Sequence, residues 1–336
     1  MVDRANGRKA VTDARRDLLS IVTPTFNEER NIPVLYERLK QSLDPLDQDW
    51  EWIVVDDHSA DASFAVASGI AAEDPRVRCY RLSRNSGSHA AWTCGLHACD
   101  GDAAVIMASD LQDPPELIPS MVQAWLGGAQ VVSAVRRRRE GEKGSTIFFA
   151  NLFYWIMRNV LGMAWMPATG ADFMLIDRRV VAAFRRHQER NVHLFALITW
   201  MGFRQHDIFY DKQARLHGRS GWNLARRIKL AIDTVTPFSY LPIRFMSLTG
   251  VTVACGGFLY ALFIIAKTLL TGKEAQGWAS LMVAILVIGG LIMVMLGILG
   301  EYVWRAYEEA RRRPAFIVES EVDRRSARSE DPRCKD

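Results

Sequence analysis

Two long uncharged apolar segments near the C-terminus constrain what this chain can fold into more than any other feature. They read FMSLTGVTVACGGFLYALFIIA (245–266) and WASLMVAILVIGGLIMVMLGILG (278–300). Each exceeds the roughly 20 residues that a helix needs to cross the hydrocarbon core of a bilayer. The alternative is a hydrophobic hairpin buried inside a soluble core. We expect a two-helix transmembrane hairpin over residues 243–303.

Composition and charge agree with a chain that lies partly in lipid. The 336 residues are 49% hydrophobic and 24% charged, a high hydrophobic fraction for a wholly soluble protein. Arginines follow the second apolar segment, and no apolar signal-peptide core precedes residue 20. We therefore expect a multi-pass protein of the cell (inner) membrane, with its N-terminal domain and both termini in the cytoplasm. The five cysteines lack metal-ligand spacing and are interpreted as free thiols.

The first half of the chain alternates between strand and helix patterns. Strands that alternate with helices of 10 to 15 residues form a doubly wound α/β sheet with mainly parallel strands. Both ends of the chain are rich in charge, so residues 1–17 are expected to be a disordered tail and residues 304–336 a cytoplasmic tail. The predicted strands are 19–23, 51–55, 77–82, 103–107 and 129–135, and the predicted helices are 31–43, 61–73, 88–99 and 117–128.

Polar residues follow four of these strands at the point where each strand ends. In open α/β sheets, ligands bind outside the carboxyl ends of the strands, so four such clusters indicate one shared site. The clusters comprise Pro24, Asn27 and Glu28; Asp56 and Asp57; Asn85 and Gly87; and Asp110, Gln112 and Asp113.

The fourth cluster, ASDLQDPPE (108–116), places oxygen-bearing side chains on a short turn. Asp110 and Gln112 therefore suit a hard cation, Mg²⁺ or Mn²⁺, although a solvated turn uses the same residue types. The chain lacks a Walker loop and a G-x-G-x-x-G fingerprint. A metal-bound nucleoside diphosphate is the simplest ligand, with Glu28 and Asp57 accepting hydrogen bonds from its base or ribose. No nucleic-acid partner is expected.

Five ordered motifs carry a resemblance to a known family. They are TPTFNEE (23–29), VVDDHSAD (54–61), SRNSG (83–87), ASDLQDPPE (108–116) and GADFMLIDR (170–178). Together they resemble the family 2 glycosyltransferases, and within these the polyisoprenyl-phosphate glycosyltransferases similar to dolichol-phosphate mannose synthase. The resemblance covers about residues 18–310, including both apolar segments.

The resemblance implies a GT-A fold, a Rossmann-like and mainly parallel sheet, over residues 18–222. It also implies inverting transfer of a sugar from a UDP- or GDP-sugar donor to a polyprenyl phosphate, undecaprenyl or dolichyl, at the cytoplasmic membrane face. Asp110 and Gln112 would hold the metal, and Asp110 and Asp172 would be catalytic, Asp172 by orienting the sugar or acceptor or by assisting as a base. The resemblance implies that Pro24, Phe26, Glu28 and Asp57 hold the nucleoside. From their places after the second and third strands, Asp56 and Asn85 are also expected to contact the nucleotide-sugar.

Two departures from the family pattern leave alternatives open. Ala108 stands where the family usually has the first Asp of Asp-any-Asp-Leu-Gln, and Gly221 stands where a later motif has Lys. A catalytically degenerate nucleotide-sugar binding or scaffold protein in the membrane is therefore the alternative function. A processive polysaccharide synthase of the same superfamily is a closer rival, but the chain lacks the Gln-x-x-Arg-Trp motif and the additional spans of that group.

The acceptor side is predicted from arginines. RRRRE (136–140) follows a strand, and an anionic lipid phosphate suits the planar fork of arginine, although a solvated cationic loop is the ordinary explanation. We expect Arg136, Arg139, Arg215 and Arg219 to contact the acceptor phosphate. The segments 145–163 and 223–242 are expected to lie at the lipid surface, the latter as an amphipathic helix, and a homo-oligomer is left open.

Overall fold

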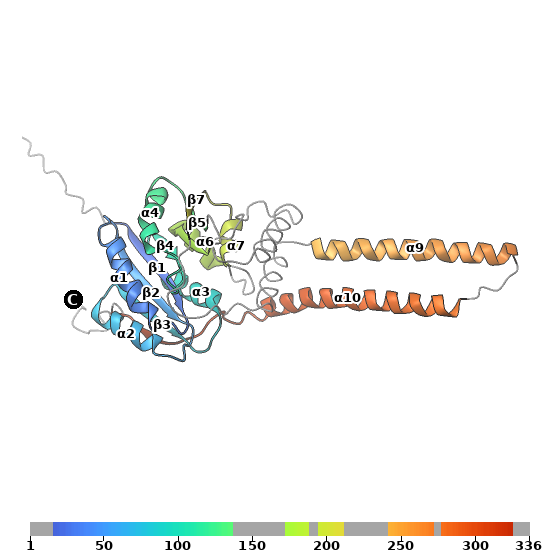
Figure 1. The fold of residues 1–336 in the computed structure, drawn as a ribbon, viewed down its shortest axis with the longest axis horizontal. Coiled ribbons are helices and arrows are strands. Elements are labelled where there is room, and N and C mark those ends of the chain that lie inside the picture. Colours follow the sequence, from blue (N-terminus) through green and yellow to red (C-terminus); the bar gives the residue numbers. More distant parts are fainter. Residues whose placement is uncertain (1–15, 137–171, 188–193, 212–240, 272–276, 325–336) are drawn as a thin grey trace, which may run out of the picture.

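The computed structural model describes residues 16–136, 172–187, 194–211, 241–271 and 277–324. They form an eight-stranded sheet in the order β7-β5-β6-β4-β1-β2-β3-β8, with two long helices projecting from the sheet domain (Figure 1). The strands are β1 (Leu18–Thr25), β2 (Asp49–Asp56), β3 (Val77–Leu82), β4 (Ala103–Ile106), β5 (Val131–Arg136), β6 (Phe173–Asp177), β7 (Gln205–Tyr210) and β8 (Val318–Val322).

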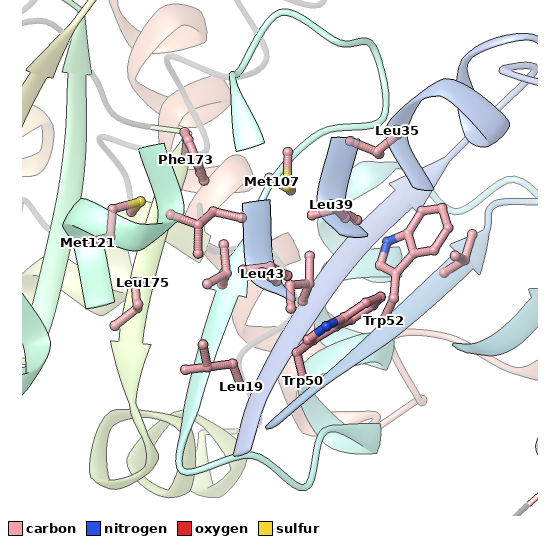
Figure 2. Close-up of a cluster of buried hydrophobic side chains, with 14 of the residues drawn as sticks. Leu19, Leu35, Leu39, Leu43, Trp50, Trp52, Met107, Met121, Phe173 and Leu175 are labelled. Carbon is pink, nitrogen blue, oxygen red and sulfur yellow. The ribbon is translucent and has the colours of Figure 1, made fainter. Parts of the chain in front are cut away.

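Helices cover both faces of this sheet because successive side chains of each strand point to opposite faces. On one face, Leu19 and Ile21 of β1 pack with the apolar sides of α1, α2 and α4, and Figure 2 shows part of this core around Trp52 and Leu39. On the other face, Val22 packs with α3, α6 and α7. The helices are α1 (Asn31–Leu43), α2 (Ser63–Glu73), α3 (Ser88–Ala98), α4 (Ile118–Leu126), which follows the short 3₁₀ turn η1 (Pro115–Leu117), α6 (Arg178–Arg186) and α7 (Leu194–Trp200).

The strand directions are mixed but mainly parallel, as predicted. Strands β3, β2, β1 and β4 run parallel to one another, and β5 runs parallel to β7. Strand β6 is antiparallel to both β4 and β5 and lies between them. The sequence pattern placed the 129–135 strand directly after 103–107 and contained no information about this insertion. Because β6 is reversed, its first residues lie at the same edge of the sheet as the carboxyl ends of the parallel strands.

The two long helices are α9 (Leu241–Thr271) and α10 (Trp278–Ala310). By length and composition, Ile243–Lys267 and Ser280–Ala310 are long and apolar enough to cross a membrane, and none of the apolar windows is buried inside the protein. The helices lie side by side, and the end of α9 and the start of α10 are both remote from the sheet domain (Figure 1). A hairpin buried in a soluble core, the alternative to the transmembrane prediction, is not what the structure shows.

The prediction of a tail over residues 304–336 is wrong for the part that the structure describes. Helix α10 continues to Ala310, and β8 then pairs antiparallel with the free edge of β3. Two ion pairs secure β8: Arg78 Nε lies 2.8 Å from an Asp323 oxygen, and Arg81 Nε lies 3.2 Å from a Glu319 oxygen. The sequence VESEV has too few apolar residues to predict a strand, because the backbone and these charges make the contact.

Several predicted features lie outside the described residues. The segment 145–163 and nearly all of 223–242 cannot be compared with the structure, and the same holds for residues 1–15. Arg139, Arg215 and Arg219 also fall there.

Candidate active site

Hydrogen bonds join the loops that follow β1 and β2 at the carboxyl edge of the sheet. The Asp57 amide donates to the Thr25 carbonyl at 2.8 Å, and the Asn27 amide donates to Ser59 Oγ at 2.9 Å. Asn27 and His58 have φ angles of 57° and 60°, the left-handed region that few non-glycine residues adopt. The two loops therefore form one unit with a specific backbone geometry rather than two independent turns.

The Asp57 carboxylate connects this unit to the loop after β3. One oxygen accepts from the Ser86 amide at 2.7 Å and the other from the Gly87 amide at 2.8 Å. Burial raises the pKa of Asp57, and the two amide bonds oppose that shift. Gly87, with a φ of 90°, directly precedes α3. Asp57 thus sets the position of Asn85 and of the start of α3.

Asp56 is fully buried, whereas the expectation was a contact with the nucleotide-sugar. Its two oxygens accept from the Ser59 amide at 3.2 and 3.3 Å, and one of them lies 3.8 Å from Arg81 Nη1. Its observed contacts hold the turn that carries Asp57.

The loop after β1 carries three of the residues predicted to hold the nucleotide. Pro24 is buried, and its carbonyl accepts from Ser109 Oγ at 3.0 Å, which ties β1 to the loop after β4. Phe26 is 46% exposed, an uncommon position for an aromatic ring beside polar loops. The Glu28 amide donates to Ser63 Oγ at 2.8 Å, and the Glu28 carboxylate accepts from Asn31.

The loop after β4 holds Asp110 in a constrained turn. Leu111 has a φ of 59°, and its side chain is fully buried in the core beneath the turn. The Asp110 carboxylate, on a residue that is 9% exposed, accepts from the Gln112 amide at 3.2 Å. A left-handed leucine is unfavourable on its own, so the packing of Leu111 enforces the turn that positions Asp110.

The donor groups near Asp110 fit a metal that is shared with a substrate. Among the described residues, no group of three or more His, Cys, Asp or Glu side chains is placed to hold a metal ion. Mg²⁺ is commonly bound by one or two carboxylates together with substrate phosphates, rather than by a protein cage. For such a metal, Asp110 would supply one carboxylate and Gln112 an amide oxygen, while Ala108 would contribute none, so the remaining ligands would come from a bound diphosphate and water.

A second set of polar residues lies where β5, β6 and β7 reach the same edge. The Tyr210 hydroxyl donates to Asp113 Oδ1 at 2.5 Å, and Arg136 Nη2 lies 2.5 Å from both oxygens of Asp172. Asp113 is 1% exposed, and burial together with this carboxylate raises the pKa of Tyr210. Arg136 also faces Tyr210 and Asp113. The loops from β3 across to β7 are therefore linked by contacts between their polar groups.

Comparison with known proteins identifies the family. The sequence model of the family described as Glycosyl transferase family 2 matches residues 20–185. Over 300 residues the chain is 37% identical to the uncharacterized glycosyltransferase YkcC of Bacillus subtilis, covering 89% of this chain and 93% of that one. The chain belongs to glycosyltransferase family 2. This confirms the predicted resemblance, and the sheet domain is its GT-A glycosyltransferase domain.

One further relative and one solved structure are also similar to this family 2 glycosyltransferase. The bactoprenol glucosyl transferase of Shigella phage SfV is 33% identical over 303 residues, covering 90% of this chain and 98% of that one. The solved structure of the mannosyltransferase PcManGT of Pyrobaculum calidifontis, in complex with GDP-Man and Mn²⁺, is 19% identical with a TM-score of 0.47. It covers 88% of this chain and 85% of that one.

The structure brings two separately predicted residues of this glycosyltransferase into direct contact. Arg136 was expected to bind acceptor phosphate and Asp172 to be catalytic, and they form an ion pair. The side chain of Asp172 remains 47% exposed, so it also faces solvent. Tyr210 was missed, because QHDIFY lacks the apolar alternation that predicts a strand and a lone tyrosine gives no signal of a buried acidic partner.

Two buried cysteines of the sheet domain are not suited to nucleophilic catalysis. Cys79 and Cys94 are buried free thiols, and burial raises the pKa of each to about 12. Thiols with such pKa values stay protonated at neutral pH and are inert.

Proposed function

We propose that this glycosyltransferase transfers a sugar from a UDP- or GDP-sugar to a polyprenyl phosphate at the cytoplasmic face of a membrane, with inversion at the anomeric carbon. The observation that carries the proposal is the set of hydrogen-bonded loops at one sheet edge, which holds Asp57, Asp110 and Asp172, in a chain with two uncovered apolar helices. The name of the Shigella phage relative supports a polyprenyl acceptor.

The donor would bind across the loops after β1, β2 and β3. Phe26 offers an exposed ring to the base, while Glu28 and the polar loop at Asn85 offer hydrogen-bonding groups to the nucleoside. Asp57 would act mainly through the Ser86 and Gly87 amides that it fixes. Because these loops are already joined to one another, little ordering would be needed when the donor binds.

The diphosphate would lie against the turn at Asp110. Asp110 and Gln112 would hold a divalent cation there, and such a cation, when bound, neutralises negative charge on the leaving diphosphate. The backbone of this turn, with Leu111 buried beneath it, keeps the Asp110 carboxylate in place.

The acceptor needs positioning more than deprotonation. A phosphate monoester is largely a dianion at neutral pH, because its second pKa is about 6. One of its oxygens would attack the anomeric carbon on the face opposite the diphosphate, which inverts that centre. Asp172, held by Arg136, would orient the sugar or the acceptor, and Arg136 would keep its positive charge beside the incoming phosphate.

The alternative is a degenerate nucleotide-sugar binding or scaffold protein. It is favoured by Ala108, which removes one carboxylate that the family usually has at this turn, and by the lack of a three-residue metal cluster among the described residues.

Lipid labelling tests the proposal against this alternative. Membranes containing the protein would be incubated with labelled nucleotide-sugars, undecaprenyl phosphate and Mg²⁺ or Mn²⁺, and the lipid phase extracted. We expect labelled lipid from the wild type and none from Asp110→Asn. Asp47→Asn, the same chemical change at an exposed position between α1 and β2, is the matched control and should label normally. Nucleotide binding without labelled lipid from any donor would favour the binding protein.

A further inference from the structure

A cavity of about 830 Å³ lies between the sheet domain and the end of α10. Its wall includes Asn85 and Ser86, from the loop that Asp57 holds, and residues of α3, α6 and α7. It also includes Glu308 and Glu309, at the end of α10, and residues 312–316 after it. The cavity therefore adjoins both the candidate donor loop and the region where the second long helix ends.

Aromatic residues indicate that the end of α10 is at a membrane surface. The Trp304 and Tyr307 rings lie 5.9 Å apart, each about half exposed, and the Arg311 guanidinium lies 5.2 Å from the Tyr307 ring. Tryptophan and tyrosine beside arginine are typical of the interface between hydrocarbon and water. If α10 crosses the membrane, the cavity residues after Tyr307 lie at the level of the lipid head groups.

The charge of the cavity favours an anion. Four arginines line it against two glutamates, Glu308 and Glu309. Among the residues that the structure describes, Arg84, Arg312 and Arg313 form no ion pair. Arginine binds phosphate with a planar fork of donors, which makes it the preferred residue for such groups.

Apolar side chains share this wall with the arginines. Phe184, Leu194, Leu197 and Phe316 line the cavity, and Phe316 also packs against the core beneath α3. A free inorganic anion would gain nothing from these side chains, whereas a phosphate attached to a hydrocarbon chain would contact both kinds of residue. The lining therefore matches an amphiphilic phosphate.

We propose that this cavity first receives the phosphate of the polyprenyl acceptor, through Arg312 and Arg313, where the lipid leaves the membrane and before that phosphate reaches Arg136 and Asp172. This inference rests on the proposed function and names a site for its acceptor. The segment after α10 then has two roles: β8 attaches it to the sheet, and its arginines bind the lipid substrate where that lipid leaves the membrane.

Kinetics of the full-length protein in vesicles test the assignment. Arg312 has a φ of 46°, and asparagine tolerates this conformation, so Arg312→Asn combined with Arg313→Gln removes both charges without new strain. We expect the KM for undecaprenyl phosphate to rise about tenfold or more, the usual effect of losing charge-assisted hydrogen bonds, with the donor KM unchanged. Arg311→Gln, whose arginine packs on Tyr307 outside the cavity, is the matched control and should leave both values unchanged. An unchanged acceptor KM in the double variant would overturn the proposal.

Two further measurements complete the test. The first distinguishes binding of the acceptor from binding of bulk anionic lipid, and the second distinguishes failure of this proposal from failure of the proposed function. Rates are compared in vesicles of phosphatidylcholine with and without phosphatidylglycerol; an effect of the double variant that appears only with phosphatidylglycerol would assign the cavity to bulk anionic lipid and refute the proposal. Equilibrium binding of labelled undecaprenyl phosphate to the protein is measured without any donor. Weaker binding by the double variant supports the cavity even if the wild type transfers no sugar, and equal binding refutes it.

Discussion

Replacing Gly95 with alanine should destabilise the sheet domain, although alanine is the better helix former. Helix α3 crosses β1 at this point: a Cβ built on Gly95 would lie 2.3 Å from Val22 Cγ1 and 3.3 Å from Val55 Cγ2. Both valines are fully buried on central strands. A β-branched side chain has few alternative rotamers, so the helix would have to move away from the sheet.

Opposing terms decide the size of the effect. An alanine in place of glycine within a helix stabilises it by about 0.5–1 kcal/mol. Overpacking a filled core costs typically about 1–3 kcal/mol, and the contact with Val22 is well inside van der Waals distance. We therefore expect a net loss of about 1–2 kcal/mol in the free energy of unfolding. Since α3 begins directly after Gly87, its displacement should also weaken the amide contacts with Asp57.

Gly69 of α2 offers a matched control, because nothing lies within 4 Å of a Cβ placed there. Gly69→Ala should stabilise the domain by about 0.5–1 kcal/mol. Urea unfolding of the full-length variants in detergent, followed by tryptophan fluorescence, gives both changes. If Gly95→Ala were as stable as Gly69→Ala, the close packing of α3 on β1, and the placement of the site that depends on it, would be refuted.

Two other predictions concern hydrogen-bonded carboxylates. Asp57→Asn supplies one acceptor oxygen for two amides, so amide hydrogen exchange at Ser86 and Gly87 should accelerate about 10- to 100-fold; unchanged exchange would contradict the anchoring role. Burial acts to raise the pKa of Asp74, but hydrogen bonds from Arg76 and Tyr36 outweigh it and hold the pKa at about 2, below the ordinary value of 3.8. The pKa of Asp74 is lower in the folded state than in the unfolded state. The hydrogen bonds to Asp74 therefore stabilise the fold above pH 3.8, and this stabilisation is lost as the pH falls towards 2. Melting curves should therefore show less acid sensitivity in Asp74→Asn than in the wild type over that range, and identical pH profiles would contradict the pairing.

Some of the candidate site was predictable because local patterns encode it. Strands β1 to β4 are apolar runs, and in a parallel sheet the polar residues after them must gather at one edge. Asp57 and Asp110 were therefore identified from their positions alone. The contacts of these carboxylates could not be predicted. The sequence did not indicate that both oxygens of Asp57 accept hydrogen bonds from backbone amides, or that Asp56 is fully buried.

Contacts between distant segments had no comparable signal. Tyr210 meets Asp113 across 97 residues, and Arg136 meets Asp172 across 36. Both contacts depend on β6 being inserted in reverse between β4 and β5, a choice made by packing and not by any pattern within Phe173–Asp177.

The sequence by itself determined that the chain has an alternating α/β domain and two apolar helices. Strands and helices that bury one or both faces require apolar residues at regular spacings or in continuous runs, and these patterns are visible in the sequence. It also determined which oxygen-bearing residues follow the strands. Only the tertiary structure decided that β8 returns from α10 to the edge of β3, and that Arg312 and Arg313 line the same cavity as Asn85. Such proximities result from the packing of whole elements against one another, and no local spacing of residues encodes them.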